Sequence, residues 1–261
     1  MQQSFRRALK ATGKANNVYV ITGPDYIELV ASQLPELPPE NLIVEPTSRD
    51  TAPAIGYATI HLKQRLQDAV MIVIPSDHVV LDEERFAETL LRAAEVASEG
   101  EYLVTIGIKP TRPEESYGYI ECAEPLAEYN ESLIIEGNNE TNREIDGHKK
   151  EVRVYRVRKF IEKPPVEVAL KFLKGGRHLW NAGIFVWKLS TIRRAFSEYA
   201  PAVYEGLREI ESMLQRDEET GRREDFLAEI QKRFLALERK SIDYALLEKA
   251  DNILVVPGDF G

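Results

Sequence analysis

The sequence predicts an α/β fold with a doubly wound, mostly parallel sheet flanked by helices. Five apolar residues, 70–74, follow one another without alternation, which is typical of a strand covered on both faces. Strands and helices take turns along the first hundred residues, and this β-α-β-α-β order favours a parallel, Rossmann-like sheet. We therefore expect a single domain over residues 1–261, with a first half (1–100) and a more elaborate second half (101–261).

The elements of the first half follow from local signals. Gly13 ends an N-terminal helix, Asp25 can cap the next helix, and Pro53 is tolerated in the first turn of the third. Three prolines between residues 35 and 39 separate the second helix from a short strand. These signals predict strands over 18–22, 42–44 and 70–74, and helices over 2–10, 25–33, 51–66 and 83–98.

The second half is less regular. Prolines at 110 and 113 break the chain after a strand, and the polar, asparagine-rich stretch 123–150 indicates a variable hairpin or loop. Apolar and basic residues alternate imperfectly over 152–161, as in a half-buried strand, and glycines at 175 and 176 close the helix that follows. We expect strands over 103–108, 117–120, 152–161, 182–187 and 252–256, a helix over 166–173, and three helical stretches between 191 and 249.

Composition narrows the class of partner. A formal net charge of −9 argues against nucleic acid or an anionic membrane as the main partner, although a few local cations suffice to bind a phosphorylated small molecule. Cys122 is the single cysteine, so an intrachain disulfide is excluded and a reducing compartment such as the cytoplasm is expected. No apolar stretch is long enough to span a bilayer, and a secretory signal is not recognisable.

The strongest candidate for chemistry is Asp77. The apolar run 70–74 stops at Pro75, which cannot donate a hydrogen bond to a sheet and therefore ends the strand. Ligands of open α/β sheets bind just beyond the carboxyl ends of such strands. We therefore expect Asp77 to lie in the functional site, whereas the neighbouring His78 is expected only to cap or contact the loop.

Two polar turns offer binding groups, each with a purely structural alternative. Residues 45–53 join a strand end to a helix start, where free backbone N–H groups and the helix dipole favour an anion or a base edge. A helix capped by Asp50 explains the same residues equally well. Gly118 lies at a strand start and permits close approach of a ligand to the backbone, although a β-bulge explains it too.

Three further segments place polar side chains at element ends. Glu162 and Lys163 can reach one ligand only if the strand has ended before them, as Pro164 suggests, and otherwise they form a surface ion pair. Asn181 can bind a sugar hydroxyl or hold a turn. The stretch 241–248 predicts a helix start and carries only a weak functional signal.

Taken together, these segments resemble the sugar-1-phosphate nucleotidyltransferases over nearly the whole chain. The resemblance is carried by E-P-x-S-R-D-T-A-P-A-I at 45–55, P-S-D-H at 75–78, G-I-x-P-T-x-P-E-x-x-Y-G-Y-I at 107–120, F-I-E-K-P at 160–164, W-N-A-G-I-F at 180–185, S-I-D-Y-A-L-L-E-K at 241–249 and P-G-D-F-G at 257–261. The E-K-P stretch is common to the class, whereas the first two segments resemble the mannose-1-phosphate guanylyltransferase branch.

The resemblance implies a reaction and a role for each candidate residue. The reaction is transfer of GMP from GTP to mannose 1-phosphate, which gives GDP-mannose and pyrophosphate and depends on Mg²⁺. Residues 1–100 would form the nucleotide-binding half and residues 101–261 the sugar-phosphate-binding half, and a homodimer is compatible with this arrangement. The implied roles are catalysis by Lys163 and by Asp77, which also holds the metal; nucleotide binding by Glu45, Pro46, Asp50, Thr51, Ala52 and Ser76; and sugar binding by Gly118, Glu162 and Asn181.

The chain departs from the family pattern in two respects. Asp50 stands where the family usually has asparagine, but a carboxylate can still accept hydrogen bonds from the N1–H and N2–H₂ donors of guanine. The family's first strand, its G-G-x-G-T-R-L phosphate loop and its C-terminal W-x-D-V-G segment have no counterpart within residues 1–261. We therefore expect a fragment with impaired activity, in which strands 18–22 and 70–74 are not neighbours.

Other functions stay open at this point. A glucose-1-phosphate thymidylyl- or uridylyltransferase fits residues 117–119 and 162–164 but fits 45–55 less well. A glycosyltransferase that uses a GDP-sugar would need a D-x-D metal motif where this chain has one acid, Asp77. A catalytically inactive, sugar-nucleotide-binding regulatory protein would fit the absent segments, whereas the acids and the lysine at 77, 162 and 163 favour an enzyme.

Overall fold

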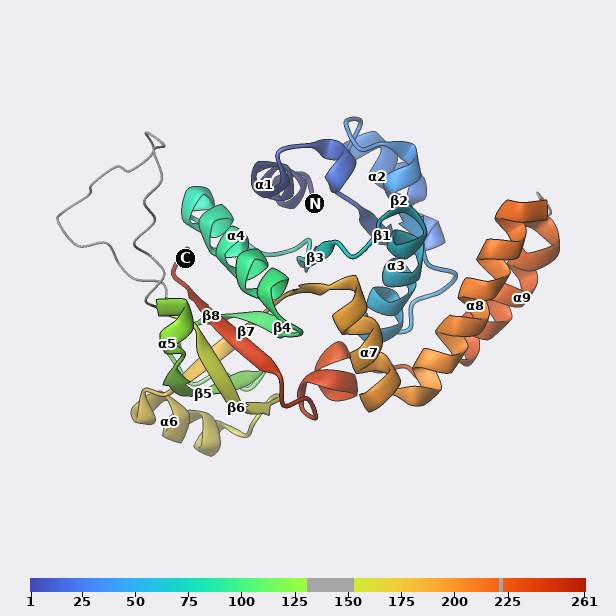
Figure 1. Cartoon of the computed structure of the whole chain (residues 1–261). Coiled ribbons are helices and arrows are strands. Elements are labelled where there is room, and N and C mark those ends of the chain that lie inside the picture. The colour runs from blue at the N-terminus through green and yellow to red at the C-terminus, as the bar shows by residue number, and fades with distance from the viewer. Residues whose placement is uncertain (131–152, 221–222) are drawn as a thin grey trace.

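Helices and strands alternate along the chain, as expected for the α/β class. The computed structural model describes residues 1–130, 153–220 and 223–261 (Figure 1). The strands are β1 (Val20–Thr22), β2 (Leu42–Val44), β3 (Val70–Val73), β4 (Leu103–Ile108), β5 (Tyr119–Pro125), β6 (Tyr155–Ile161), β7 (His178–Lys188) and β8 (Ile253–Gly258). The α-helices are α1 (Gln2–Thr12), α2 (Ile27–Gln33), α3 (Thr51–Arg65), α4 (Glu83–Glu99), α5 (Ala127–Asn130), α6 (Val166–Gly175), α7 (Leu189–Tyr199), α8 (Pro201–Thr220) and α9 (Arg223–Ala236). Short helical turns are η1 (Ala15–Asn17), η2 (Pro24–Tyr26), η3 (Pro39–Asn41) and the π-type turn η4 (Asp243–Leu247).

The strands form one large mixed sheet and one small parallel pair. The large sheet has the order β3-β7-β4-β8-β6-β5, and β1 pairs with β2 in the small sheet. In the large sheet β4 and β8 are parallel, while β7 is antiparallel to both β3 and β4. The α/β class with flanking helices is confirmed. The share of parallel pairs is smaller than expected, because β7 is inserted between two strands that themselves run in the same direction.

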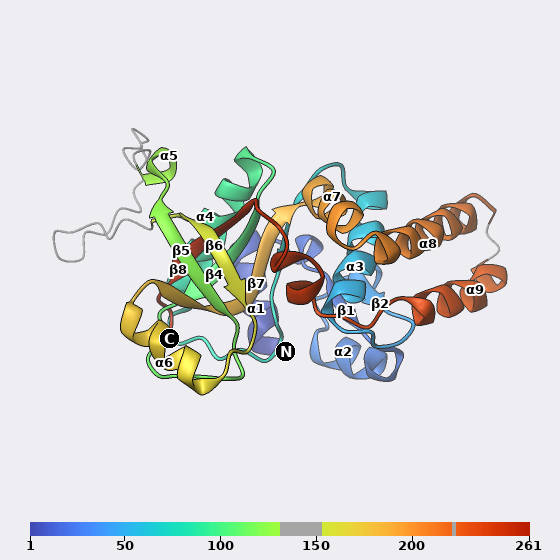
Figure 2. The same cartoon turned by 90° about the horizontal axis from the view of Figure 1, so that it is seen from below.

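Both faces of the large sheet are covered, which explains its unbroken apolar runs. Along β8, Ile253 and Val255 pack into a core with α3, α7 and α8, whereas Leu254 and Val256 pack against α4 on the opposite face. These four residues are at most 2% exposed. Seen from below, α8 and α9 form a hairpin that projects away from the sheet beyond α3 and α7 (Figure 2). Helix α1 packs on α4.

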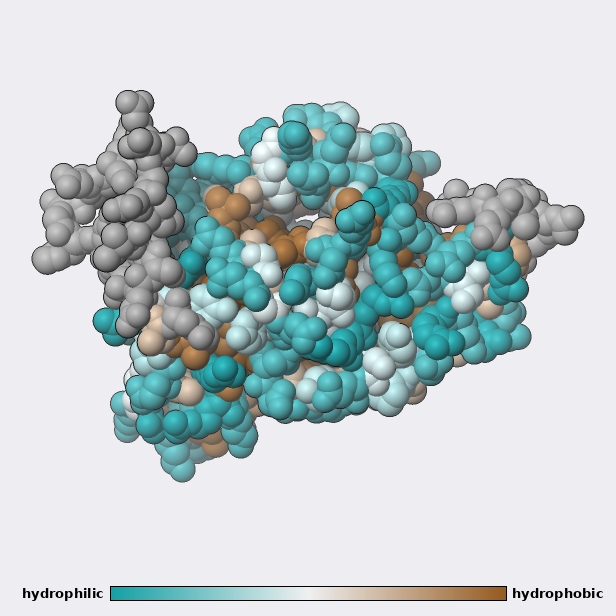
Figure 3. Space-filling model, viewed as in Figure 1, coloured by the Kyte–Doolittle hydropathy of each residue, from teal (hydrophilic) through white to brown (hydrophobic). Residues whose placement is uncertain are grey.

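The first-half strands do not form one sheet. β1 and β3 belong to separate sheets, so the expectation that strands 18–22 and 70–74 are not neighbours is confirmed; within residues 1–130, 153–220 and 223–261, each has one unpaired edge. All four residues of β3 and all three of β1 are only half-buried, although the apolar run had predicted full burial on both faces. Apolar side chains accordingly gather in a recess at the level of β3, beneath α1 and α2 (Figure 3).

Most expected elements are present with shifted ends. The strand expected over 182–187 begins at His178, and the one expected over 117–120 runs over β5 to Pro125. The loop or hairpin expected over 123–150 lies largely outside the described residues. The helical stretches expected between 191 and 249 correspond to α7, α8 and α9, and the π-type turn η4 follows them as a separate element. Across the parts of the chain that the structure describes, helices are too short or too polar to cross a membrane.

Candidate active site

A polar pocket lies where the second half of the chain meets the start of α3. Its volume is about 510 Å³, within the range of small-molecule sites. The lining residues come from the turn before α3, the turn between β6 and α6, and the segment that follows α9. They are Asp50, Thr51, Glu162, Lys163, Arg239, Lys240, Ser241, Asp243, Tyr244 and Glu248.

Hydrogen bonds join the end of α9 and the segment after it to the start of α3. The Arg49 side chain donates from Nε to the carbonyl of Leu237 over 3.1 Å and also reaches the carbonyl of Leu235. The Ala52 N–H donates to the carbonyl of Lys240 over 3.1 Å, and the Ile242 N–H donates to Thr51 Oγ1 over 2.8 Å. Two stretches about 190 residues apart therefore form one wall of the pocket.

These bonds overturn one expectation about the turn 45–53. The Thr51 N–H donates to Asp50 Oδ1 over 2.7 Å, the Ala54 N–H donates to the Asp50 carbonyl over 3.3 Å, and residue 53 is proline. With the Ala52 N–H bonded to Lys240, the first turn of α3 has no free N–H group for an anion. Asp50 is a helix cap, as the structural alternative predicted, and Ala52 is fully buried. Ala52 is not among the residues that line the pocket, and its nucleotide-binding role stays a prediction.

Two pocket residues have strained backbones. Asp50 has φ 70° and Lys163 has φ 45°, and these are the positive-φ non-glycine residues of the described chain. Such conformations cost on the order of 1–3 kcal/mol each and persist where the surrounding structure enforces them. At Lys163 the turn ends β6 after Ile161, so that Glu162 and Lys163 both line the pocket, as their sequence positions predicted.

Of the three residues proposed as a sugar site, Gly118 lies against both Glu162 and Asn181. A Cβ atom on Gly118 would lie 2.5 Å from Glu162 Oε2 and 3.4 Å from Asn181 Cβ, so any other residue here would make the carboxylate move from its present position. The Asn181 N–H donates to the Gly118 carbonyl over 2.8 Å. Glycine therefore allows the present position of the Glu162 carboxylate. Pairing of β5 with β7 brings Gly118 beside Asn181, and pairing of β5 with β6 brings it beside Glu162.

A β-bulge directs the Asn181 side chain. The register of β4 against β7 shifts between Thr105 and Gly107, and Gly183 within the bulge has φ 64°. Asn181 Oδ1 accepts hydrogen bonds from Thr105 Oγ1 and from the Gly183 N–H, both over 3.1 Å. Asn181 Nδ2 donates to Asp243 Oδ1 over 3.0 Å. The amide is thus held between the sheet and η4.

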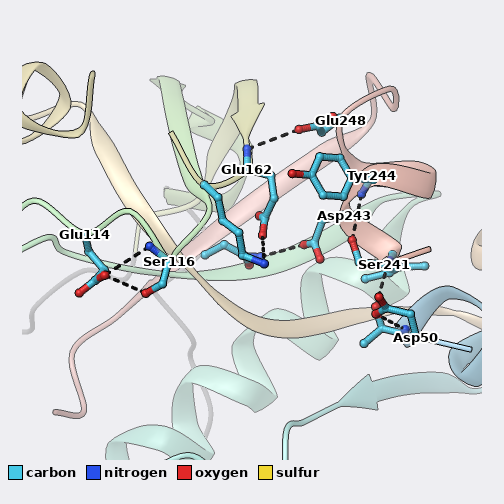
Figure 4. Close-up of polar contacts among 12 residues, drawn as sticks. Asp50, Glu114, Ser116, Glu162, Ser241, Asp243, Tyr244 and Glu248 are labelled. Atoms are coloured by element: carbon cyan, nitrogen blue, oxygen red, sulfur yellow. Dashed lines mark hydrogen bonds and ion pairs between the residues drawn. The ribbon is translucent and has the colours of Figure 1, made fainter. Parts of the chain in front are cut away.

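The acidic side chains of the pocket are crowded (Figure 4). Burial, and next the nearby Glu162 carboxylate, raise the pKa of Asp243 to about 6. Burial also raises the pKa of Glu162, whose Oε1 lies 3.5 Å from Lys163 Nζ. The Glu162 N–H donates to Glu248 Oε1 over 3.4 Å. With a pKa of about 6, the Asp243 carboxyl group can change its protonation state near neutral pH.

Asp77 and Ser76 lie elsewhere, at the tip of β3. The Ser76 carbonyl accepts from the amino group of Met1 and from Ser4 Oγ, over 3.2 and 2.9 Å, so the start of α1 fixes this loop. Asp77 is exposed and is not among the residues that line the pocket. Pro75 lies close to Gly183: a Cβ atom built on Gly183 would be 3.7 Å from the Pro75 side chain. The tip of β3 therefore adjoins the bulge that follows Asn181. The described residues contain no group of three or more His, Cys, Asp or Glu side chains able to hold a metal.

Glu45 and Pro46 follow β2 at the edge of the small sheet. The Glu45 N–H donates to the Thr22 carbonyl over 2.9 Å. Its Oε2 atom is buried without a hydrogen-bond partner among the described residues, and burial raises the pKa of this carboxyl group. Pro46 is half-buried. Neither residue lines the pocket around Asp243.

Sequence reasoning missed Thr105, Arg239 and Lys240, and it undervalued Asp243. Thr105 lies inside an apolar strand and gives no local signal of its bond to Asn181. Asp243 was visible only as part of the stretch 241–249. Arg239 and Lys240 look like ordinary surface cations, and only the contacts with α3 place them at the pocket.

Comparison with protein families gives a match over most of the chain. A family profile described as "Nucleotidyl transferase" matches residues 1–231. Among curated proteins, "Mannose-1-phosphate guanylyltransferase 2" of Escherichia coli O157:H7 is 32% identical over 246 residues, which is 93% of this chain and 46% of that protein. "Mannose-1-phosphate guanylyltransferase" of Salmonella montevideo is 33% identical over 251 residues, 95% of this chain and 47% of that protein. The chain thus spans about half the length of these relatives.

Two solved structures share the fold over 99% of this chain. One, titled "mannose-1-phosphate geranyltransferase" from Thermus thermophilus, has a TM-score of 0.75 at 26% identity, with 64% of that chain covered. The other, titled "mannose-6-phosphate isomerase" from Helicobacter pylori, has a TM-score of 0.73 at 20% identity, with 88% of that chain covered. At 20% sequence identity, the second structure is evidence for the fold alone.

Proposed function

The chain belongs to the nucleotidyl transferase family, and from this premise we propose that it transfers GMP from GTP to mannose 1-phosphate. The products are GDP-mannose and pyrophosphate. The names of the curated relatives support the choice of substrates, and the chain matches them over 93% or more of its length. The close approach of Gly118 to both Glu162 and Asn181 is the structural observation that carries the proposal.

That contact suits a sugar. Sugar hydroxyls both donate and accept hydrogen bonds, so a site for them needs an acceptor and a donor side by side. In its ionised form the Glu162 carboxylate accepts only, and Asn181 keeps one Nδ2 hydrogen that is not used by Asp243. In this proposal Glu162 and Asn181 bind hydroxyl groups of mannose, and Gly118 allows the sugar to approach the backbone.

Cations at the same pocket suit the phosphate of the sugar. Lys163, Arg239 and Lys240 line it, and Lys240 Nζ pairs with Glu238 over 3.2 Å. Arg239 forms no ion pair with the described residues, so its charge is available to a ligand. A cation about 4 Å from a phosphate near the protein surface gains roughly 4 kcal/mol before desolvation costs. Lys163 is held close to the sugar site by the sharp turn at the end of β6.

A magnesium ion fits the single carboxylate at the β3 tip. Asp77 is exposed and accepts no hydrogen bond from the described residues, and Mg²⁺ commonly uses one or two carboxylates together with water and phosphate oxygens. In the proposal Asp77 would hold this ion, which would supply charge neutralisation for the phosphates of GTP. Ser76 next to it, with Glu45, Pro46, Asp50 and Thr51, faces the nucleotide.

In this transfer reaction the protein's task is to align the two substrates. A phosphate oxygen of mannose 1-phosphate attacks the α-phosphorus of GTP in line, a new P–O bond forms, and the bond to pyrophosphate breaks. Lys163 and Arg239 would hold the attacking phosphate, and Glu162 and Asn181 would fix the direction of the sugar. No covalent bond to the protein is needed.

Pyrophosphate release is the direct test. The chain would be incubated with Mg²⁺, mannose 1-phosphate and in turn GTP, UTP, dTTP or ATP. Turnover with GTP and with no other nucleotide, even at the low rate expected of this chain, supports the proposal. Faster turnover with UTP or dTTP and glucose 1-phosphate replaces it with the uridylyl or thymidylyl alternative. Calorimetric binding of mannose 1-phosphate without turnover would indicate a binding protein that has lost catalysis, and absence of both would refute the proposed function.

A further inference from the structure

The Asn181 side chain is held by groups that together fix its direction. The backbone N–H of Gly183 can only donate, so the atom of Asn181 that faces it must be the amide oxygen. Thr105 Oγ1 lies 3.1 Å from the same amide oxygen. The amide nitrogen must then point to the other side, where its partner is Asp243 Oδ1 at 3.0 Å.

Asp243 uses one of the two Nδ2 hydrogens and leaves the second for a ligand. The carboxylate is an acceptor only, so this bond and the bond from Gly183 favour the same orientation of the amide. Loss of Asp243 would leave the nitrogen without that partner, and the amide would be held on its oxygen side alone, by Gly183 and Thr105. The nitrogen side would then tilt more freely, so the direction of the remaining hydrogen depends on the carboxylate as well as on the oxygen-side contacts.

Asp243 is itself firmly placed. The Ile242 N–H donates to Thr51 Oγ1 over 2.8 Å, and Ala245 and Leu246 in the same turn are fully buried. The position is unfavourable for an acid, since Asp243 is half-buried and Glu162 lies nearby with the same charge. A residue with a purely structural role would not need to be acidic in such surroundings.

We propose that Asp243 is a positioning residue, which orients the Asn181 amide so that its free Nδ2 hydrogen meets an acceptor oxygen of the bound sugar. The identity of the ligand rests on the proposed function, whereas the orientation of the amide rests only on the contacts of Asn181. Asp243 acts through Asn181 and is not required to touch the ligand.

A spectroscopic test of the orientation needs no ligand. The side-chain NH₂ signals of Asn181 would be identified in a ¹⁵N–¹H correlation spectrum by their loss in Asn181→Asp, and followed between pH 5 and 8. We expect them to shift with a midpoint near 6, where Asp243 titrates. The charged groups facing Asp243 across the pocket are Glu162, Lys163, Asp50, Arg239, Lys240 and Glu248. The shift should persist in Glu162→Gln and vanish in Asp243→Asn; persistence in Asp243→Asn would overturn the proposal.

A binding test separates orientation from charge. The affinity for mannose 1-phosphate would be measured by calorimetry at pH 7.5 for the unchanged chain, Asp243→Asn, Asp243→Ala and Asp243→Ser. Asparagine keeps a carbonyl acceptor for Asn181 Nδ2, so we expect its affinity to stay within about threefold of the unchanged chain. Alanine and serine remove that acceptor, and loss of one hydrogen bond of this kind weakens binding by roughly 10- to 30-fold. Asp25→Asn, an exposed acid far from the pocket in sequence, is the control.

The outcomes distinguish the two proposals. An asparagine variant as weak as the alanine variant would mean that the charge of Asp243 acts on the ligand directly, which contradicts the positioning role. Unchanged affinity in the alanine and serine variants would contradict it as well. If the unchanged chain fails to bind mannose 1-phosphate, the proposed function fails, and the spectroscopic test still decides the orientation of Asn181.

Discussion

We predict that Asp243→Asn stabilises the protein at neutral pH and leaves its stability nearly unchanged at pH 4. The substitution keeps the size of the side chain and an oxygen that can accept from Asn181 Nδ2. It removes a negative charge that lies half-buried beside Glu162. Comparison of the variant with the unchanged chain therefore measures the free-energy cost of holding that charge in the pocket.

The magnitude follows from the pKa of Asp243. Folding raises this pKa from 3.8 to about 6, so between these values the folded chain keeps a proton that the unfolded chain has lost. The stability that this proton supplies is fully present below pH 4 and is lost as the pH rises through 6. At about 1.36 kcal/mol per pH unit the cost at pH 7.5 has an upper bound of about 3 kcal/mol. Asp243 keeps some access to solvent, and the charge-assisted bond from Asn181 becomes a neutral one, so we expect a net gain of about 1–2 kcal/mol.

Urea unfolding is a suitable assay, because Trp180 and Trp187 are 7% and 0% exposed and report the loss of the core by fluorescence. The difference in unfolding free energy between Asp243→Asn and the unchanged chain would be measured at pH 4, 6 and 7.5, with Asp25→Asn as the control. We expect the difference to grow with pH. A difference that is the same at every pH, or an asparagine variant that is less stable at pH 7.5, would refute the reasoning.

Three further substitutions test the candidate site. Gly118→Ala places a Cβ atom 2.5 Å from Glu162 Oε2, so calorimetry should show at least tenfold weaker binding of mannose 1-phosphate, whereas Gly175→Ala, with open space around it, should bind normally. Arg239→Ala removes an unpaired cation from the pocket, and steady-state kinetics should show a KM for mannose 1-phosphate raised about tenfold, consistent with one screened charge contact. Asp77→Asn should abolish Mg²⁺-dependent turnover with a Tm shift below about 2 °C, since the side chain is exposed; unchanged turnover would remove Asp77 from the site.

The sequence was informative wherever a local pattern determines the structure. The apolar run 70–74 correctly placed a strand that ends before Asp77, and the break after Ile161 correctly placed Glu162 and Lys163 in one pocket. The run failed to predict burial, however. All four residues of β3 stay half-buried because one edge of the strand is unpaired, and pairing is not a local property.

The turn before α3 shows the same limit. Its polar residues and helix start were visible, and Asp50 is the helix cap that one interpretation predicted. The other interpretation, a binding site of free N–H groups, was wrong because the Ala52 N–H already donates a hydrogen bond to the Lys240 carbonyl. The two residues are separated by most of the chain, and no pattern around residue 52 indicates the contact.

The sequence alone predicted the α/β class, the order of the elements and the family resemblance. It also grouped Gly118, Glu162 and Asn181 as one site. Each depends on periodicity, on glycine and proline, or on short motifs, which act over a few residues. Only the tertiary structure brought Arg239, Lys240 and Asp243 to that site and set Thr105 and Asp243 on either side of the Asn181 amide. Strand register and the packing of distant segments decide such contacts, and so does the pKa of an acid, because it depends on burial and on charges that folding brings near.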